Sequence, residues 1–162
     1  MKKLISVLMI LMLIAPAAGA EYVVDPNLKL SVLKSLYDVN AILMQLPKIS
    51  DAIEIESGYY YCQENETLLF INVAEQEATD NPTYVMGCGS TENTKMDDFL
   101  LTCICMIKTM NSTEDETVLY GQLMDLYIKC RNKYPVPTVE QGSIIMIMKQ
   151  DNGSYIFAVY EK

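Results

Sequence analysis

The sequence contains no histidine and no tryptophan, and its 12 basic residues are outnumbered by 21 acidic ones. Without histidine, Ser-His and Cys-His nucleophile pairs, imidazole acid–base catalysis and histidine-containing metal triads are all excluded. The acidic excess gives a formal net charge of −9, and a protein of that sign repels phosphate backbones and anionic lipid headgroups. We therefore expect no nucleic-acid partner.

Sequence motifs for phosphate, calcium and zinc binding are missing as well. The sequence has no glycine-rich phosphate loop, no calcium-binding loop and no zinc-ligand spacing. Hydrolysis by a carboxylate pair needs two acids that flank a bond, and Asp97 with Asp98 is the obvious candidate. The same two acids are favoured at the positive N-terminus of a helix, which is the simpler interpretation. The sequence therefore favours a protein that is not an enzyme and holds no cofactor.

The first 20 residues have the pattern of a secretory signal peptide. Lys2 and Lys3 precede an apolar run from Leu4 to Ala15, and the small residues Ala18-Gly19-Ala20 form a cleavage site. That run is too short to cross a hydrocarbon core of ~30 Å, and no later stretch has the ~18 apolar residues that a membrane helix needs. We predict a signal peptide, a single mature domain over residues 21–162 without a membrane span, and a periplasmic or extracellular location.

The expected oxidation state of the five cysteines depends on that compartment. In an oxidising environment, five cysteines indicate two disulfides and one free thiol. The preferred pairs are Cys62 with Cys88, and Cys130 with either Cys103 or Cys105, although the sequence leaves the pairing open. Closing the loop between Cys62 and Cys88 stabilises an unstrained fold by roughly 3–4 kcal/mol.

Hydrophobic periodicity predicts an α+β fold. Apolar residues recur every three or four positions from Leu28 to Leu46, which predicts an N-terminal helix that ends before Pro47. The pair Asp25-Pro26 resembles an N-cap followed by proline at the first helical position. Strand-type segments at 52–62, 68–73 and 83–88 then predict a small antiparallel meander.

The second half of the chain predicts a central helical hairpin and a C-terminal β-hairpin. Two amphipathic helices are expected between Thr94 and Lys133, and the stretch from Phe99 to Ile107 is apolar on nearly every side, as in a central buried helix. Segments 143–148 and 155–160 flank an Asn152-Gly153 turn that is typical of a β-hairpin. The two sheet segments are expected to join into one sheet with helices on a single face.

Tyrosine gives the clearest functional signal. It supplies a large contact area with a polar end and is enriched at protein interfaces, although it is also a good strand residue. Our first hypothesis is a small exported non-enzymatic protein that binds another protein or an envelope component, as an inhibitor or immunity-type protein does. The tyrosines predicted to form its interface are Tyr59, Tyr60, Tyr61, Tyr84, Tyr155 and Tyr160.

The alternative hypothesis is a thiol redox or Cu(I)-binding protein that uses Cys103, Cys105 and neighbouring methionines. Two features disfavour it: apolar surroundings raise the pKa of a thiol, and residues two apart on a helix point roughly 200° from each other. A reactive thiol in the native protein would distinguish this hypothesis from the first. The methionines concerned also suit a core; they are Met106, Met110, Met146 and Met148.

Overall fold

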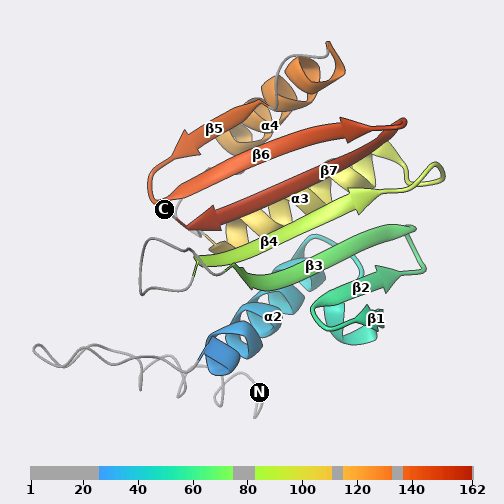
Figure 1. Ribbon diagram of the computed structural model, residues 1–162, viewed down its shortest axis with the longest axis vertical. Helices are drawn as coiled ribbons and strands as arrows, with labels where there is room; N and C mark the ends of the chain where they lie inside the picture. The colour runs from blue at the N-terminus through green and yellow to red at the C-terminus, as the bar shows by residue number, and fades with distance from the viewer. Residues whose placement is uncertain (1–25, 75–82, 111–114, 133–136, 162) are drawn as a thin grey trace, which may run out of the picture.

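The computed structural model of the chain describes residues 26–74, 83–110, 115–132 and 137–161, and the predicted signal peptide lies outside them. These residues form three α-helices and one seven-stranded antiparallel sheet, which confirms the predicted α+β class (Figure 1). The helices are α2 (Pro26–Leu43), α3 (Met96–Met110), α4 (Glu116–Arg131) and the short 3-10 helix η1 (Ile49–Asp51). The strands are β1 (Ile53–Glu56), β2 (Tyr59–Cys62), β3 (Thr67–Ala74), β4 (Thr83–Ser90), β5 (Thr138–Gln141), β6 (Ile144–Asp151) and β7 (Ser154–Glu161).

The strands follow the order β1-β2-β3-β4-β7-β6-β5, and every neighbouring pair is antiparallel. The first four strands form the predicted meander, and β6 with β7 forms the predicted hairpin. Pairing of β4 with β7, in which Cys88 lies opposite Phe157, joins the two segments into one sheet as expected. The edge strand β5 is an addition that the periodicity did not predict.

The C-terminal hairpin turns at two residues with positive φ, Asn152 at 49° and Gly153 at 89°. They lie between Asp151 and Ser154, which pair with each other across the two strands. A two-residue turn of this kind needs both central residues in the left-handed region, and Asn-Gly adopts that conformation readily. The local sequence therefore fixes the register of β6 against β7.

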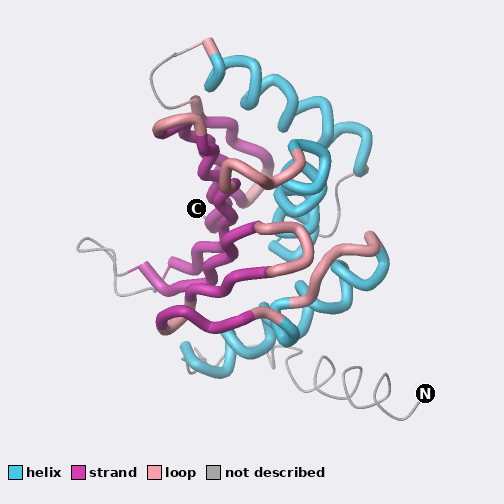
Figure 2. Tube along the Cα trace, turned by 90° about the vertical axis from the view of Figure 1, so that its right-hand side faces the viewer, coloured by secondary structure: helices cyan, strands magenta, loops and turns pink. Residues whose placement is uncertain are grey.

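Figure 2 shows the three described α-helices on one side of the sheet. The middle helix of this layer is α3, which packs on β4 and β7 and contacts α2 and α4. Asp97 and Asp98 occupy its first turn, where the helix dipole favours acids. The helix is buried on more than one side, as its sequence predicts; its fully buried residues include Phe99, Cys103, Cys105, Met106 and Ile107.

Candidate binding face of the sheet

Strand alternation and register assign each residue of the sheet to one of two faces, because successive side chains point to opposite faces and paired residues share one. Leu69, Cys88 and Phe157 form a cross-strand row on the face that the helices cover. We name the opposite face the open face; in Figure 1 it is turned toward the viewer, with α3 behind the strands. It carries Ile53, Glu56, Tyr59, Tyr61, Leu68, Phe70, Asn72, Thr83, Val85, Gly87, Gly89, Thr138, Glu140, Ile145, Ile147, Lys149, Ser154, Ile156, Ala158 and Tyr160.

Apolar and aromatic side chains dominate the open face. Its described charged side chains are Glu56 on β1, Glu140 on β5 and Lys149 on β6, so that β2, β3, β4 and β7 present no charge there. Four of its large apolar side chains are at least 40% exposed, namely Ile53, Tyr59, Leu68 and Ile156. In an acidic protein, the centre of this face is therefore an uncharged and partly solvent-exposed surface.

An aromatic pair shapes the middle of the open face. The rings of Tyr59 and Phe70 have centroids 5.9 Å apart, and the Phe70 ring lies across Gly87 on the next strand. A Cβ at Gly87 would lie 2.0 Å from Cζ of Phe70 and 2.4 Å from the carbonyl oxygen of Phe157, so this position needs glycine. A Cβ at Gly89 would meet nothing closer than 3.7 Å. Gly87 thus allows the Phe70 ring to lie close against the sheet.

The six tyrosines predicted to form an interface are divided between the two faces. Three of them are at most 7% exposed beneath the helices: Tyr60, Tyr84 and Tyr155. The other three lie on the open face: Tyr59, Tyr61 and Tyr160. An interface role remains a prediction for the open-face tyrosines, whereas burial removes the other three from the surface of the folded chain.

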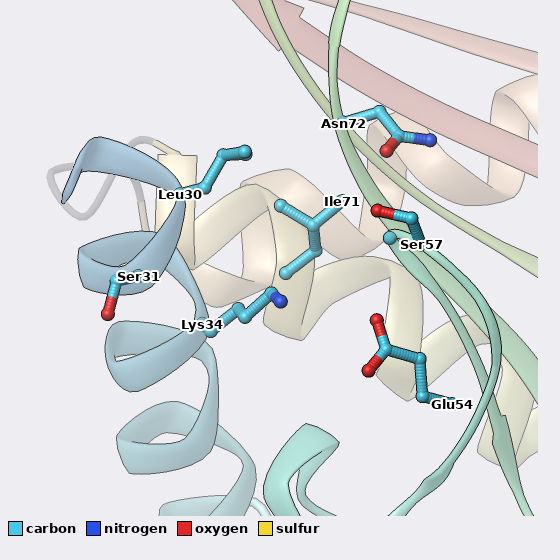
Figure 3. Close-up of a pocket in the computed structure, with 8 residues that line it drawn as sticks. Leu30, Ser31, Lys34, Glu54, Ser57, Ile71 and Asn72 are labelled. Carbon is cyan, nitrogen blue, oxygen red and sulfur yellow. The ribbon is translucent and has the colours of Figure 1, made fainter. Parts of the chain in front are cut away.

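Polar and apolar residues line a pocket of about 240 Å³ between α2 and the β1–β3 side of the sheet (Figure 3). Lys34 donates a hydrogen bond from its ammonium to the hydroxyl of Tyr60, and that hydroxyl donates to a carboxylate oxygen of Glu54 at 3.3 Å. The ammonium also lies 4.8 Å from the centroid of the Tyr60 ring. Lys34 is therefore already paired with Tyr60, and this contact connects α2 to the sheet. We assign the polar groups of the pocket a structural role.

All five cysteines are buried free thiols, so the predicted disulfides are not confirmed. The expected pair of Cys62 on β2 and Cys88 on β4 has the whole of β3 between its members. Strands two positions apart are separated by ~10 Å, beyond the ~7 Å that the Cα atoms of a disulfide span. Cys130 has no bond to Cys103 or Cys105. Instead, the Sγ atoms of Cys88 and Cys103 lie 3.5 Å apart.

The thiols of the redox alternative, Cys103 and Cys105, are fully buried. Burial raises the pKa of Cys105 to about 12, and burial together with the neighbouring Cys88 thiol raises the pKa of Cys103 well above its ordinary value. A reactive cysteine needs a low pKa and access, so both side chains fit a structural role better. Three of the accompanying methionines are fully buried in the core: Met106, Met146 and Met148.

Metal binding has little support from the described residues. Among them, no three His, Cys, Asp or Glu side chains are grouped in a way that could hold a metal ion. All five thiols belong to the buried hydrophobic core.

Sequence reasoning missed most of the open face, including Leu68, Phe70 and Ile156. Alternation assigns these residues to strands and divides each strand into two faces, but it does not say which of the two faces the helices leave uncovered. One signal was available: alternation within β2 places Tyr60 on the face opposite to Tyr59 and Tyr61.

Comparison of the chain with models of protein families, with curated proteins and with solved structures finds no match. None of the described helices is long and apolar enough to cross a membrane. The functional interpretation therefore rests on the geometry and charge of the chain itself.

Proposed function

We propose that this chain is an exported, acidic, non-enzymatic protein that binds another protein through the open face of its sheet. The proposal rests on one observation, which is that the helices pack on only one of the two faces of the sheet. The helices bury one face, whereas no described element packs on the other, which is nevertheless apolar. Contiguous exposed apolar surface marks interaction sites on soluble proteins. Inhibitors, immunity-type proteins and envelope-associated proteins are the classes that such a surface suits, and export rests on the signal-type N-terminal residues.

The open face has the size of a specific interface. The strands β3, β4, β6 and β7 have eight residues each. Strands of that length extend ~26 Å and four of them together are ~19 Å wide, which gives a flat area of about 500 Å². The shorter strands β1, β2 and β5 enlarge this area toward the ~800 Å² that each partner contributes to a standard protein–protein interface.

Charge identifies the chemistry of the partner. Acidic residues are exposed at the edges and ends of the sheet, among them Glu56, Glu64, Glu92 and Glu140. The partner that complements this arrangement has an apolar patch for the uncharged centre and basic residues around it. Attraction between the acidic rim and the basic partner accelerates encounter, and burial of the apolar centre holds the complex together.

The test uses two double variants that differ only in the side of the molecule they change. Leu68→Lys with Ile156→Lys charges the open face, at positions that are 40% and 42% exposed. Leu101→Lys with Ile128→Lys makes the same substitutions on the outer sides of α3 and α4, at positions that are 37% and 51% exposed. The immobilised wild-type chain captures its partner from an extract of the compartment to which it is exported, and mass spectrometry identifies that partner.

Affinities of the purified partner are then measured by calorimetry for the wild type and both variants. We expect the open-face variant to bind at least about 10-fold more weakly, because it buries two charges in an apolar contact, and the helix-side variant to bind as the wild type does. Equal losses in both variants, or no loss in the open-face variant, would contradict the proposal. Capture of nothing but a second copy of the chain would replace it with self-association.

A further inference from the structure

The thiols of Cys88 and Cys103 are in direct contact at the centre of the fold. Cys88 lies on β4, opposite Leu69 on one side and Phe157 on the other, and Cys103 lies in the middle of α3. Their Sγ atoms are 3.5 Å apart and both residues are fully buried. The two sulfur atoms therefore sit where the central helix meets the central strand.

Two geometric features select this pair over the neighbouring thiols. Cys105 follows Cys103 by two residues and points toward another side of α3, where its thiol lies 3.8 Å from the backbone carbonyl oxygen of Tyr37 on α2. Cys62 is on β2 and is separated from Cys88 by β3. Cys103 is thus the thiol that the fold holds against Cys88.

We propose that Cys88 and Cys103 form an intramolecular disulfide that fastens α3 to the sheet. Closing it requires the sulfur atoms to approach by about 1.5 Å, from contact to the ~2.05 Å of a disulfide bond. The three remaining cysteines stay reduced. In the cell the pairing rests on the proposed export, because only an oxidising compartment maintains such a bond; in a purified protein it does not depend on location.

The oxidant is a small-molecule or protein disulfide. The thiolate of one cysteine attacks the donor disulfide, which forms a mixed disulfide and releases one donor thiol. The thiolate of the other cysteine then attacks the mixed disulfide, which forms the Cys88–Cys103 bond and releases the second donor thiol. The two protein thiols lose two electrons and two protons, and the donor disulfide gains them. Because both thiols are fully buried in the folded chain, exchange takes place before the core closes.

The test refolds the purified chain, lacking residues 1–20, in a mixture of oxidised and reduced glutathione. Free thiols are alkylated in denaturant without reduction, and the protein is then weighed and mapped by mass spectrometry. Cleavage at Glu66, Glu92 and Lys95 separates Cys62, Cys88 and the Cys103–Cys105 segment into different peptides. We expect three alkylated cysteines, a mass two hydrogens below that of the dithiol, and a peptide carrying Cys88 linked to the one carrying Cys103.

Two matched variants identify the partner of Cys88, since Cys103 and Cys105 fall in one peptide. The link is expected to persist in Cys105→Ala and to disappear in Cys103→Ala, and both positions are fully buried on the same helix. Five alkylated thiols in the refolded wild type, or a link that survives in Cys103→Ala, would overturn the proposal. Neither result bears on binding by the open face, so the two proposals fail separately.

Stability gives a second readout that needs no substitution. The bond closes a loop that includes the segment between β4 and α3, and restriction of that loop in the unfolded chain is expected to raise Tm by about 10 °C. The oxidised wild type is compared with the same protein after reduction. An unchanged Tm, with the link present in the peptide map, would show that the bond does not fasten α3 to the sheet as proposed.

Discussion

The two faces of the sheet are built from the same strands and have opposite surroundings. Phe157 and Ile156 are neighbours on β7, yet Phe157 is fully buried under the helices and Ile156 is 42% exposed on the open face. Antiparallel sheets with one solvated face usually alternate apolar and polar residues. In this protein, β6 reads Ile-Ile-Met-Ile-Met from Ile144 to Met148 without a polar residue. Such a sequence is typical of strands that are covered on both faces, and this comparison supports a role in binding for the open face.

The largest difference between the faces is expected in stability. Phe157→Ala leaves a cavity between the sheet and the helices and is expected to lower the free energy of unfolding by about 3–5 kcal/mol. Ile156→Ala removes a side chain that is only partly buried and is expected to cost under about 1 kcal/mol. Urea denaturation of both variants measures the contrast. Similar costs for the two would mean that the open face is also part of the core.

The two glycines of β4 provide a sharper comparison within the open face. Gly87→Ala places a Cβ against the Phe70 ring and the Phe157 carbonyl, and we expect a cost of about 1–3 kcal/mol from overpacking. Gly89→Ala meets only ordinary contacts at 3.7 Å or more and is expected to be neutral within about 0.5 kcal/mol. Thermal unfolding of both variants distinguishes them. If Gly89→Ala were as damaging as Gly87→Ala, the arrangement of Phe70 over the strand would be wrong.

Alkaline pH is expected to weaken the helix-covered side. Burial raises the pKa of Cys62 and of Cys105 to about 12, from an ordinary value of 9.0. Below pH 9 both the folded and the unfolded chain keep these protons, so stability is unaffected. Between pH 9 and about 12 only the unfolded chain loses them, and the free energy of unfolding falls. Burial also raises the pKa of Tyr37, which acts in the same direction.

Urea midpoints measured from pH 8 to pH 11 test this dependence. The double variant Cys62→Ala with Cys105→Ala removes both thiol protons and is expected to show a shallower decline than the wild type. If the stability of the variant fell with pH as steeply as that of the wild type, groups other than these two thiols would be responsible.

The smallest expected effect on stability belongs to the open face itself. Leu68→Lys and Ile156→Lys each place a flexible charged side chain at a position that is already at least 40% exposed. We expect each substitution to change the free energy of unfolding by no more than about 0.5 kcal/mol. Circular dichroism during denaturation checks this, and a larger loss would mean that a weakened complex reflects damage to the fold.

Much of the fold was predictable because its signals are local. Alternation, the spacing of apolar residues on helices and the Asn152-Gly153 turn identify α2, the meander, α3 and the closing hairpin. The pairing of β4 with β7 makes one sheet, yet it joins residues about 70 positions apart, such as Cys88 and Phe157. The sequence predicts that the two sheet segments join into one sheet, but it does not predict the register between β4 and β7.

The candidate site was less predictable, because it depends on which face of each strand the helices cover. Three of the six predicted tyrosines lie beneath the helices, and the two parts of the open face, on β1–β4 and on β5–β7, are joined by the β4–β7 pairing. The preferred pairing of Cys62 with Cys88 is not confirmed for a different reason: the predicted meander itself places β3 between the strands that carry them.

The central claim is that the open face, and not the helix side, contacts the partner. Its most direct test is photo-crosslinking in cells that export the protein, with a benzophenone derivative of phenylalanine in place of Tyr59 on the open face or Tyr120 on α4. Both tyrosines are 45% exposed, so access to solvent is matched. We predict a crosslinked complex with one other protein from position 59 and none from position 120. Equal crosslinking from both positions, or crosslinking from position 120 alone, would contradict the claim.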